Sequence, residues 1–195
     1  MSRGTPEETF AEARGAMERG DWEGVFVCLD PADVARIAGN TFARFLTAGG
    51  SAADTLLQIC TRHGISEATL TDLRGRGRAI IESAQLPMAP PGPAMLEQSK
   101  RHQQFVKAYQ QAKEDALGAV ADLPAFTAAM ERAVRADGSG GSVSSTLFVG
   151  ETLEQVSIEG AKAWGTRRLA DSATEDVGFV RRKTSWYIRL FARRR

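Results

Sequence analysis

The sequence predicts an α+β fold, in which a helical N-terminal two-thirds packs on a C-terminal curved antiparallel sheet of four to five strands. Up to about residue 137, apolar residues recur at helical spacing between capping residues and glycines. After the glycine- and serine-rich segment 138–142, apolar and polar residues alternate, as in half-buried strands. We therefore expect a single domain over residues 1–195, with opening helices in 1–40, a helical insertion in 41–137 and the sheet in 143–192.

The opening helices carry strong start signals. The run Thr5-Pro6-Glu7-Glu8 places a hydroxyl at the N-cap, proline at the first helical position and glutamate at the third, which is a capping box. Gly20 predicts the end of this first helix. Asp21 then predicts the start of a second helix, and Asp30-Pro31 the start of a third, which should end at Gly49-Gly50.

The middle of the chain alternates between helical patterns and stretches that contain helix breakers. We expect helices from Ser51 to about Gly64, a short one after Ser66, and longer ones over 94–118 and 122–137. Two stretches should be irregular, because glycine and proline interrupt regular structure. They are the Arg-Gly-Arg-Gly-Arg run at 74–78 and the segment 87–93, which contains four prolines.

The C-terminal third predicts five strands joined by short turns. We expect them at about 143–149, 153–159, 161–169, 175–182 and 185–192, with tight turns at Glu159-Gly160 and Lys183-Thr184. Such a meander needs a layer on its apolar face, and the upstream helices are the candidates. The residues predicted to share faces are Val156 with Ile158, Val177 with Phe179, and Trp186 with Ile188 and Leu190.

The two ends of the chain resemble one superfamily. The segments 16–22 and 25–31 resemble its opening helices, 156–163 resembles one hairpin and 178–190 the closing hairpin. On these segments the chain resembles the nuclear transport factor 2-like, or cystatin-like, superfamily, in which a curved sheet wraps around helices and forms a cone with an apolar pocket. The resemblance implies a pocket lined by Phe26, Phe179 and Trp186. It covers about eighty residues, and the section between 40 and 138 is far longer than the usual connection.

Charge and composition restrict the partners. The net charge is +1, but residues 1–33 hold three arginines against eight acids and residues 160–195 hold ten basic residues against three acids. The basic end either packs on the acidic end or favours an acidic protein partner.

We do not expect nucleic acid as a partner, because no aromatic residues are interleaved with the arginine clusters. No apolar run reaches the ~20 residues that a membrane span requires, so we expect no membrane partner.

The cysteines and the N-terminus favour a cytoplasmic protein. Cys28 and Cys60 each lie in an apolar helical pattern, so we expect buried free thiols of a reduced compartment. The first ten residues are polar and acidic, which predicts no signal peptide.

The candidate reactive groups do not form a recognisable catalytic or metal motif. The chain has two histidines, His63 and His102. Cys60 and His63 lie close in sequence, but they fit a core thiol beside a helix C-terminus better than a catalytic pair. A metal ion would require about three or four ligands, and no second pair of Cys or His residues lies near Cys60 and His63 in the sequence. The run 74–78 lacks the Lys-Ser/Thr of a phosphate loop. The conceivable acid–base groups, for which spacing gives no common site, are Asp33, Glu154 and Tyr109.

The sequence therefore leaves two hypotheses of function. The first, which we favour, is a non-catalytic protein-interaction or accessory module, of the kind of an immunity protein or a scaffold, on a cone-shaped α+β fold. It predicts no catalytic residue, no metal and no cofactor. The alternative is a small-molecule-binding protein, or an enzyme of the isomerase or dehydratase type, that uses an apolar pocket in the cone. Pairing of two copies is compatible with an open sheet face, and the sequence does not decide it.

Overall fold

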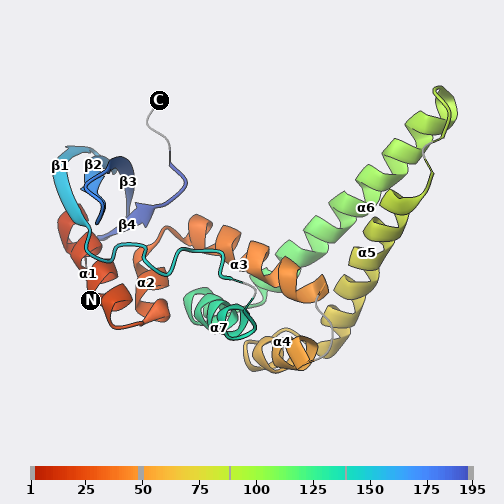
Figure 1. Ribbon diagram of the computed structural model, residues 1–195, viewed down its shortest axis with the longest axis horizontal. Helices are drawn as coiled ribbons and strands as arrows, with labels where there is room; N and C mark the ends of the chain where they lie inside the picture. The colour runs from red at the N-terminus through yellow and green to blue at the C-terminus, as the bar shows by residue number, and fades with distance from the viewer. Residues whose placement is uncertain (1–2, 48–50, 88, 139, 193–195) are drawn as a thin grey trace. The chain divides into compact units, whose positions relative to one another are not determined.

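The computed structural model describes residues 3–47, 51–87, 89–138 and 140–192, and it shows an α+β protein (Figure 1). Among these residues, seven helices precede a four-stranded antiparallel sheet that is not closed, so the predicted fold class is confirmed. The chain divides into two compact units. The first comprises residues up to Ala38 and from Leu123 onward, and the second comprises Gly39–Asp122.

The helices of the first unit begin where their caps predict. These helices are α1 (Pro6–Glu18), α2 (Trp22–Cys28), the beginning of α3 (Pro31–Thr47) and α7 (Leu123–Ala136). The predicted end of the third helix, at Gly49-Gly50, lies outside the described residues. At the start of α1, the Thr5 hydroxyl accepts the N–H of Glu8 at 3.1 Å, and the Glu8 carboxylate accepts the N–H of Thr5 at 3.2 Å. Asp21 accepts the N–H of Gly24 at 3.0 Å and so caps α2. Local side-chain chemistry thus sets these starts.

The sheet is a meander of consecutive strands. It contains β1 (Thr152–Glu159), β2 (Lys162–Arg168), β3 (Thr174–Arg182) and β4 (Ser185–Arg189), paired in that order. The predicted tight turns are present: Gly160 and Lys183 both have a positive φ, of 61° and 55°. β1 has an irregularity between Glu154 and Ser157, where Gln155 also has a positive φ. Such bulges bend a strand and increase its twist.

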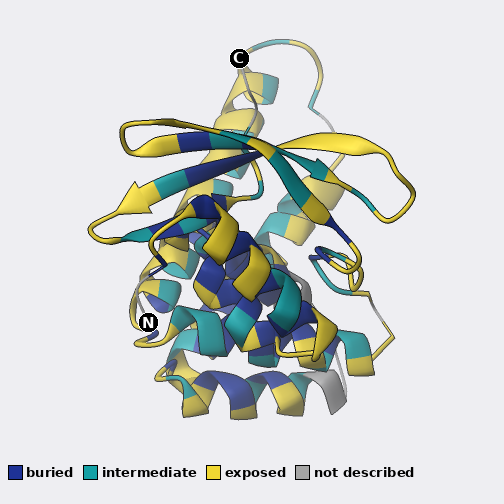
Figure 2. Ribbon diagram, turned by 90° about the vertical axis from the view of Figure 1, so that its left-hand side faces the viewer, coloured by how far each residue is buried: buried dark blue, intermediate teal, exposed yellow. Residues whose placement is uncertain are grey.

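The core of the first unit lies between the sheet and its helices (Figure 2). The predicted inward pairs are confirmed on β3 and β4, where Val177, Phe179, Trp186 and Ile188 are all buried. By contrast, Ile158 does not enter the core with Val156, since it is 53% exposed. Residues of α1 and α2 pack against these strands, and the buried cluster includes Phe10, Ala13, Met17, Trp22, Val25, Phe26, Leu29 and Phe148.

The prediction of a strand at 143–149 is wrong, because this segment forms turns. The Ser144 hydroxyl lies 2.9 Å from that of Thr146 and also accepts the Thr146 N–H at 3.2 Å. These local hydrogen bonds stabilise a turn, where a strand would need hydrogen bonds to a neighbouring strand. Phe148 has a φ of 67° and packs edge-on against Phe10, with ring centroids 5.3 Å apart. Local hydroxyl bonds and this aromatic contact therefore override the alternating pattern.

The second unit contains three further helices and overturns another prediction. They are α4 (Ser51–Arg62), α5 (Glu67–Gln85) and α6 (Pro93–Gly118). We expected residues 74–78 to be irregular, but α5 runs through them. Leu73 is fully buried, and a Cβ on Gly77 would lie at van der Waals distance, 3.7 Å, from the Tyr109 ring. Packing against α6 therefore outweighs the helix cost of two glycines, about 1 kcal/mol each.

The proline-rich segment interrupts the helices as predicted, in its described residues 87 and 89–92. α5 ends at Gln85 and α6 begins at Pro93, where the proline lies at the first helical position.

The described residues contain no helix with the length and the apolar character that a membrane span requires.

Candidate functional site

We call α5, α6 and their connection, residues 86–92, the helical arm. Its two helices run antiparallel and side by side (Figure 1), and they pack against each other. The Ser83 hydroxyl lies 2.8 Å from Nδ1 of His102. Nearer the connection, Gln98 accepts the N–H of Ala89 at 2.9 Å and donates to the carbonyl of Pro87 at 3.0 Å. The connection is therefore held to α6 by a side chain.

The outer half of the arm, which we define as residues 78–107, lacks a core of its own. The buried residues of α5 and α6 are Leu70, Leu73, Tyr109 and Ala116, and all of them belong to the inner half. Within the described part of 78–107, no residue is buried. Several large apolar side chains there are exposed: Ile81 by 47%, Leu86 by 57%, Leu96 by 58% and Phe105 by 37%. Four exposed apolar side chains within thirty residues that have no core of their own favour an interaction surface.

A hollow of about 370 Å³ opens between the two helices at this end of the arm. We call it the arm-tip hollow. A neighbouring hollow of about 250 Å³ shares several of its residues and adds Glu97 and Arg101. Apolar side chains at the mouth of such a hollow can accept a side chain from another molecule. The arm-tip hollow is lined by Ser83, Ala84, Leu86, Met95, Gln98, Ser99 and His102.

The contact between Ser83 and His102 does not form a nucleophile and its base. The Ser83 hydroxyl donates its proton to the carbonyl of Ile80 at 2.8 Å. It therefore accepts from His102, whose Nδ1 carries a proton in this arrangement. A serine nucleophile would have to donate to an unprotonated histidine nitrogen. This pair accordingly holds α5 to α6 and does not activate the serine.

The outer half of the arm is basic. Residues 78–107 include Arg78, Lys100, Arg101 and Lys107, against only Glu82 and Glu97 among the acids. Arg76, one turn further in, pairs with Asp72 at 2.7 Å, so its charge is compensated within α5. The outer half thus combines exposed apolar side chains with a net positive charge.

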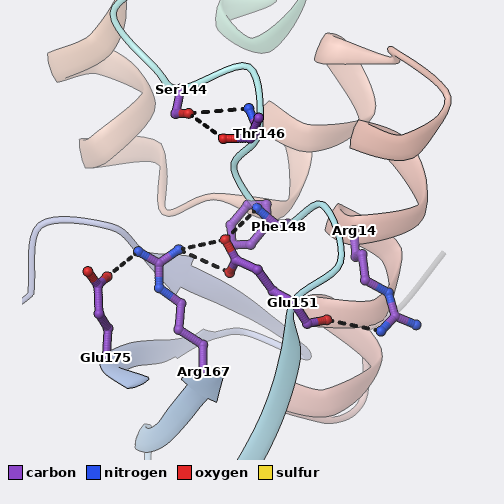
Figure 3. Close-up of polar contacts among 7 residues, drawn as sticks. All are labelled: Arg14, Ser144, Thr146, Phe148, Glu151, Arg167 and Glu175. Atoms are coloured by element: carbon purple, nitrogen blue, oxygen red, sulfur yellow. Dashed lines mark hydrogen bonds and ion pairs between the residues drawn. The ribbon is translucent and has the colours of Figure 1, made fainter. Parts of the chain in front are cut away.

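The first unit contains a polar cluster that holds a loop to the sheet (Figure 3). Glu151 is 5% exposed, accepts the N–H of Phe148 at 3.0 Å and pairs with Arg167 at 3.2 Å. Arg167 also pairs with Glu175, and Arg14 donates to the backbone carbonyl of Glu151 at 3.1 Å. Each carboxylate in the cluster already has protein donors, so the arrangement stabilises the fold and does not present a reactive group.

The residues that the resemblance places in a pocket are all buried in the first unit. Phe26, Phe179 and Trp186 are at most 3% exposed and belong to one core cluster. Phe26 also lines a hollow of about 230 Å³ within this unit. That all three line one pocket stays a prediction.

The three conceivable acid–base residues are each held locally. Asp33 accepts the N–H of Leu190 at 2.8 Å, and burial raises the pKa of its carboxyl. Glu154 pairs with Arg168 at 2.9 Å, and this guanidinium lowers the pKa of the Glu154 carboxyl. Tyr109 is buried on the arm, and burial raises its pKa. Asp33 and Glu154 thus each have a partner of their own, Leu190 and Arg168, and these groups do not constitute a site.

The cysteine–histidine pair of the second unit is not a nucleophilic site. Cys60 is buried, and burial raises the pKa of its thiol to about 12. A thiol with that pKa stays protonated at neutral pH, and the thiolate is the reactive form. Within the described residues there is also no group of three or more His, Cys, Asp or Glu side chains that could hold a metal ion.

Sequence reasoning missed the outer half of the arm, because it expected residues 74–78 to interrupt the helix. A signal was present nonetheless. Leu70, Leu73, Gly77 and Ile80 recur at helical spacing across the glycines, which is typical of one continuous helix packed on a neighbour.

The chain matches no protein-family model, no curated protein and no solved structure.

Proposed function

We propose that this chain is a non-catalytic protein-interaction module whose outer arm, residues 78–107, is the docking surface for an acidic protein. One observation carries the proposal: the outer arm exposes Ile81, Leu86, Leu96 and Phe105 while it buries none of its described residues. Exposed apolar area costs roughly 25 cal/mol per Å², so covering these side chains with a partner is favourable.

The charge of the outer arm supports an acidic occupant. The outer arm contains Arg78, Lys100, Arg101 and Lys107, which outnumber its two acids by two. An apolar segment flanked by Asp or Glu would fill the arm-tip hollow and neutralise these charges. Complementary charge accelerates encounter and fixes orientation, whereas burial of the apolar side chains supplies most of the affinity.

The rest of the molecule agrees with a binding role. The carboxylate of Glu151 is held by Phe148 and Arg167 within the protein, and both cysteines are buried free thiols. We propose that the module acts in the cytoplasm, where thiols stay reduced.

The experiment is site-specific photo-crosslinking of the full chain in its native cells. Benzoylphenylalanine replaces Leu96 in one protein and Ile158 in a matched control, since the two side chains are similarly exposed, by 58% and 53%. We expect one acidic protein to be crosslinked through position 96 and not through position 158. With the purified pair, the double variant Lys100→Glu and Arg101→Glu should raise Kd by about tenfold or more.

Three outcomes would overturn the proposal. One is a crosslink pattern that is the same at positions 96 and 158. Another is an isolated partner whose Kd is unchanged by the charge reversal. The third is a crosslink from position 96 to a second copy of the chain, with sedimentation showing a dimer, because the occupant of the outer arm would then be the chain itself.

A further inference from the structure

The hollow in the first unit has an apolar wall and one charged residue. It occupies about 230 Å³, and its wall includes Phe26, Val27, Val34, Leu123 and Tyr187. Within the described residues, Arg3 is the single charged residue that lines it. Pockets for drug-sized ligands occupy about 300–1,000 Å³, so this hollow suits a smaller molecule.

Arg3 is buried but has no carboxylate partner. It is only 7% exposed, and its Nη1 donates to the carbonyl of Val27 at 2.6 Å. Its guanidinium carbon lies 4.8 Å from the centre of the Tyr187 ring. Its Nε is buried and makes no hydrogen bond, and no ion pair of the described residues includes Arg3. The backbone of Arg3 is fixed, because its carbonyl accepts the N–H of Trp186 at 3.0 Å.

The neighbouring thiol does not supply the missing negative charge. Burial raises the pKa of the Cys28 thiol to about 11, and the nearby Arg3 guanidinium opposes this shift without cancelling it. Cys28 is therefore a neutral thiol at neutral pH. A buried cation with an incomplete set of partners is costly, and an anion placed beside it removes much of that cost.

We propose that this hollow binds a small monocarboxylate with an apolar body, such as a short-chain fatty acid, and that its carboxylate pairs with Arg3. The apolar wall would take the hydrocarbon part, and the guanidinium of Arg3, which lines the hollow, would pair with the carboxylate. A single guanidinium matches one negative charge. A phosphate dianion would need further donors that this wall does not provide.

The experiment compares hexanoate with 1-hexanol, a neutral probe of similar length, by titration calorimetry on the full chain. We expect hexanoate to bind with a Kd below about 1 mM and 1-hexanol to bind at least about tenfold more weakly. Arg3→Met keeps the apolar stem and removes the charge, so it should weaken hexanoate about tenfold and leave 1-hexanol unchanged. Arg181→Met, at an exposed arginine on β3, should change neither value.

A second variant keeps the test decisive if Arg3→Met fails to fold. Val27 lines the hollow and is 41% exposed, so Val27→Phe can narrow the hollow with little effect on the core. It should weaken hexanoate binding. The proposal is overturned if hexanoate does not bind, if it binds no better than 1-hexanol, or if both variants bind it as the unmodified protein does. It is also overturned if inorganic phosphate binds as tightly as hexanoate.

Discussion

Buried charged residues in the first unit connect its elements through hydrogen bonds and ion pairs. Glu131 is fully buried on α7 and accepts the N–H of Ser142 at 2.9 and 3.1 Å. Arg135, one turn later, pairs with Glu131, donates to the carbonyl of Val143 and lies over the ring of Trp22. The backbone at residue 141 can lie this close to Glu131 and Arg135 only because that residue is glycine. A Cβ there would collide with both charged groups. These contacts join α7 to the segment that leads into the sheet.

Asp33 predicts a specific dependence of stability on pH. Burial and the nearby Asp30 raise the pKa of its carboxyl above 3.8, so the native state holds this proton more tightly than the unfolded state. Its contribution to the free energy of unfolding therefore falls as pH rises from the ordinary to the raised pKa. Asp33→Asn removes this pH-dependent loss of stability, because asparagine does not titrate, and its side-chain oxygen can still accept the N–H of Leu190. Urea unfolding between about pH 4 and pH 7 should show the variant gaining stability over the unmodified protein as pH rises.

Glu154→Gln is the matched control for this pH series. Arg168 lowers the pKa of the Glu154 carboxyl, so this residue stabilises the protein above its ordinary pKa and loses that effect in acid. The two variants should therefore respond to pH with opposite signs. A difference for Asp33→Asn that stays constant with pH, or that has the sign of the control, would contradict the prediction.

At the scale of elements, tertiary packing decides the course of α5. Its run of alternating arginine and glycine continues the helix, in which Gly77 faces Tyr109 of α6 and Gly75 faces open space. The arginines consequently point in different directions: Arg76 pairs with Asp72 within the helix, and Arg78 belongs to the basic outer arm. They do not form a loop that could enclose a phosphate group.

Gly75→Ala tests the helical state of this run. A Cβ at Gly75 meets nothing within 4 Å. In a helix the change should therefore stabilise the second unit by about 0.5–1 kcal/mol, because alanine has the higher helix propensity. Thermal unfolding followed by far-ultraviolet circular dichroism measures the change. Gly64→Ala, in the same unit, should do the reverse, because Gly64 has a φ of 92° that alanine adopts only with strain. If Gly75→Ala had no effect, residues 74–78 would not be a stable helix in solution.

At the scale of the whole molecule, stability should differ between the two units. The first unit encloses a continuous core, whereas the outer arm of the second has only partly buried and exposed side chains. Local opening costs little free energy where few apolar groups are buried. Amide hydrogen exchange, read by mass spectrometry, should thus be faster in residues 78–107 than in α1 or β3.

The same exchange measurement tests the proposed role of the arm. A bound partner should slow exchange in residues 78–107 and leave β3 unchanged, because only the outer arm is proposed to be covered. Slow exchange there in the isolated chain would instead mean that the arm is already covered by a second copy, which is the competing occupant.

The sequence by itself determined the class of the fold and most element boundaries. The starts at Thr5 and Asp21 follow from hydrogen bonds that close within a few residues, and so they can be read without knowing the tertiary structure. The turns at Gly160 and Lys183 are likewise local. The alternation of the last three strands was readable because one face of a sheet with a single covering layer must be apolar.

Only the tertiary structure decided the course of 143–149, the continuity of α5 and the position of the candidate sites. The first depends on Phe148 packing on Phe10, and the second on Gly77 lying against Tyr109, which are contacts between residues distant in sequence. Periodicity shows which side chains are apolar, but it does not show whether another element covers them. The exposure of Leu96 on the arm and the burial of Arg3 beside an apolar hollow could therefore not be read from the sequence. Both proposals rest on these two observations.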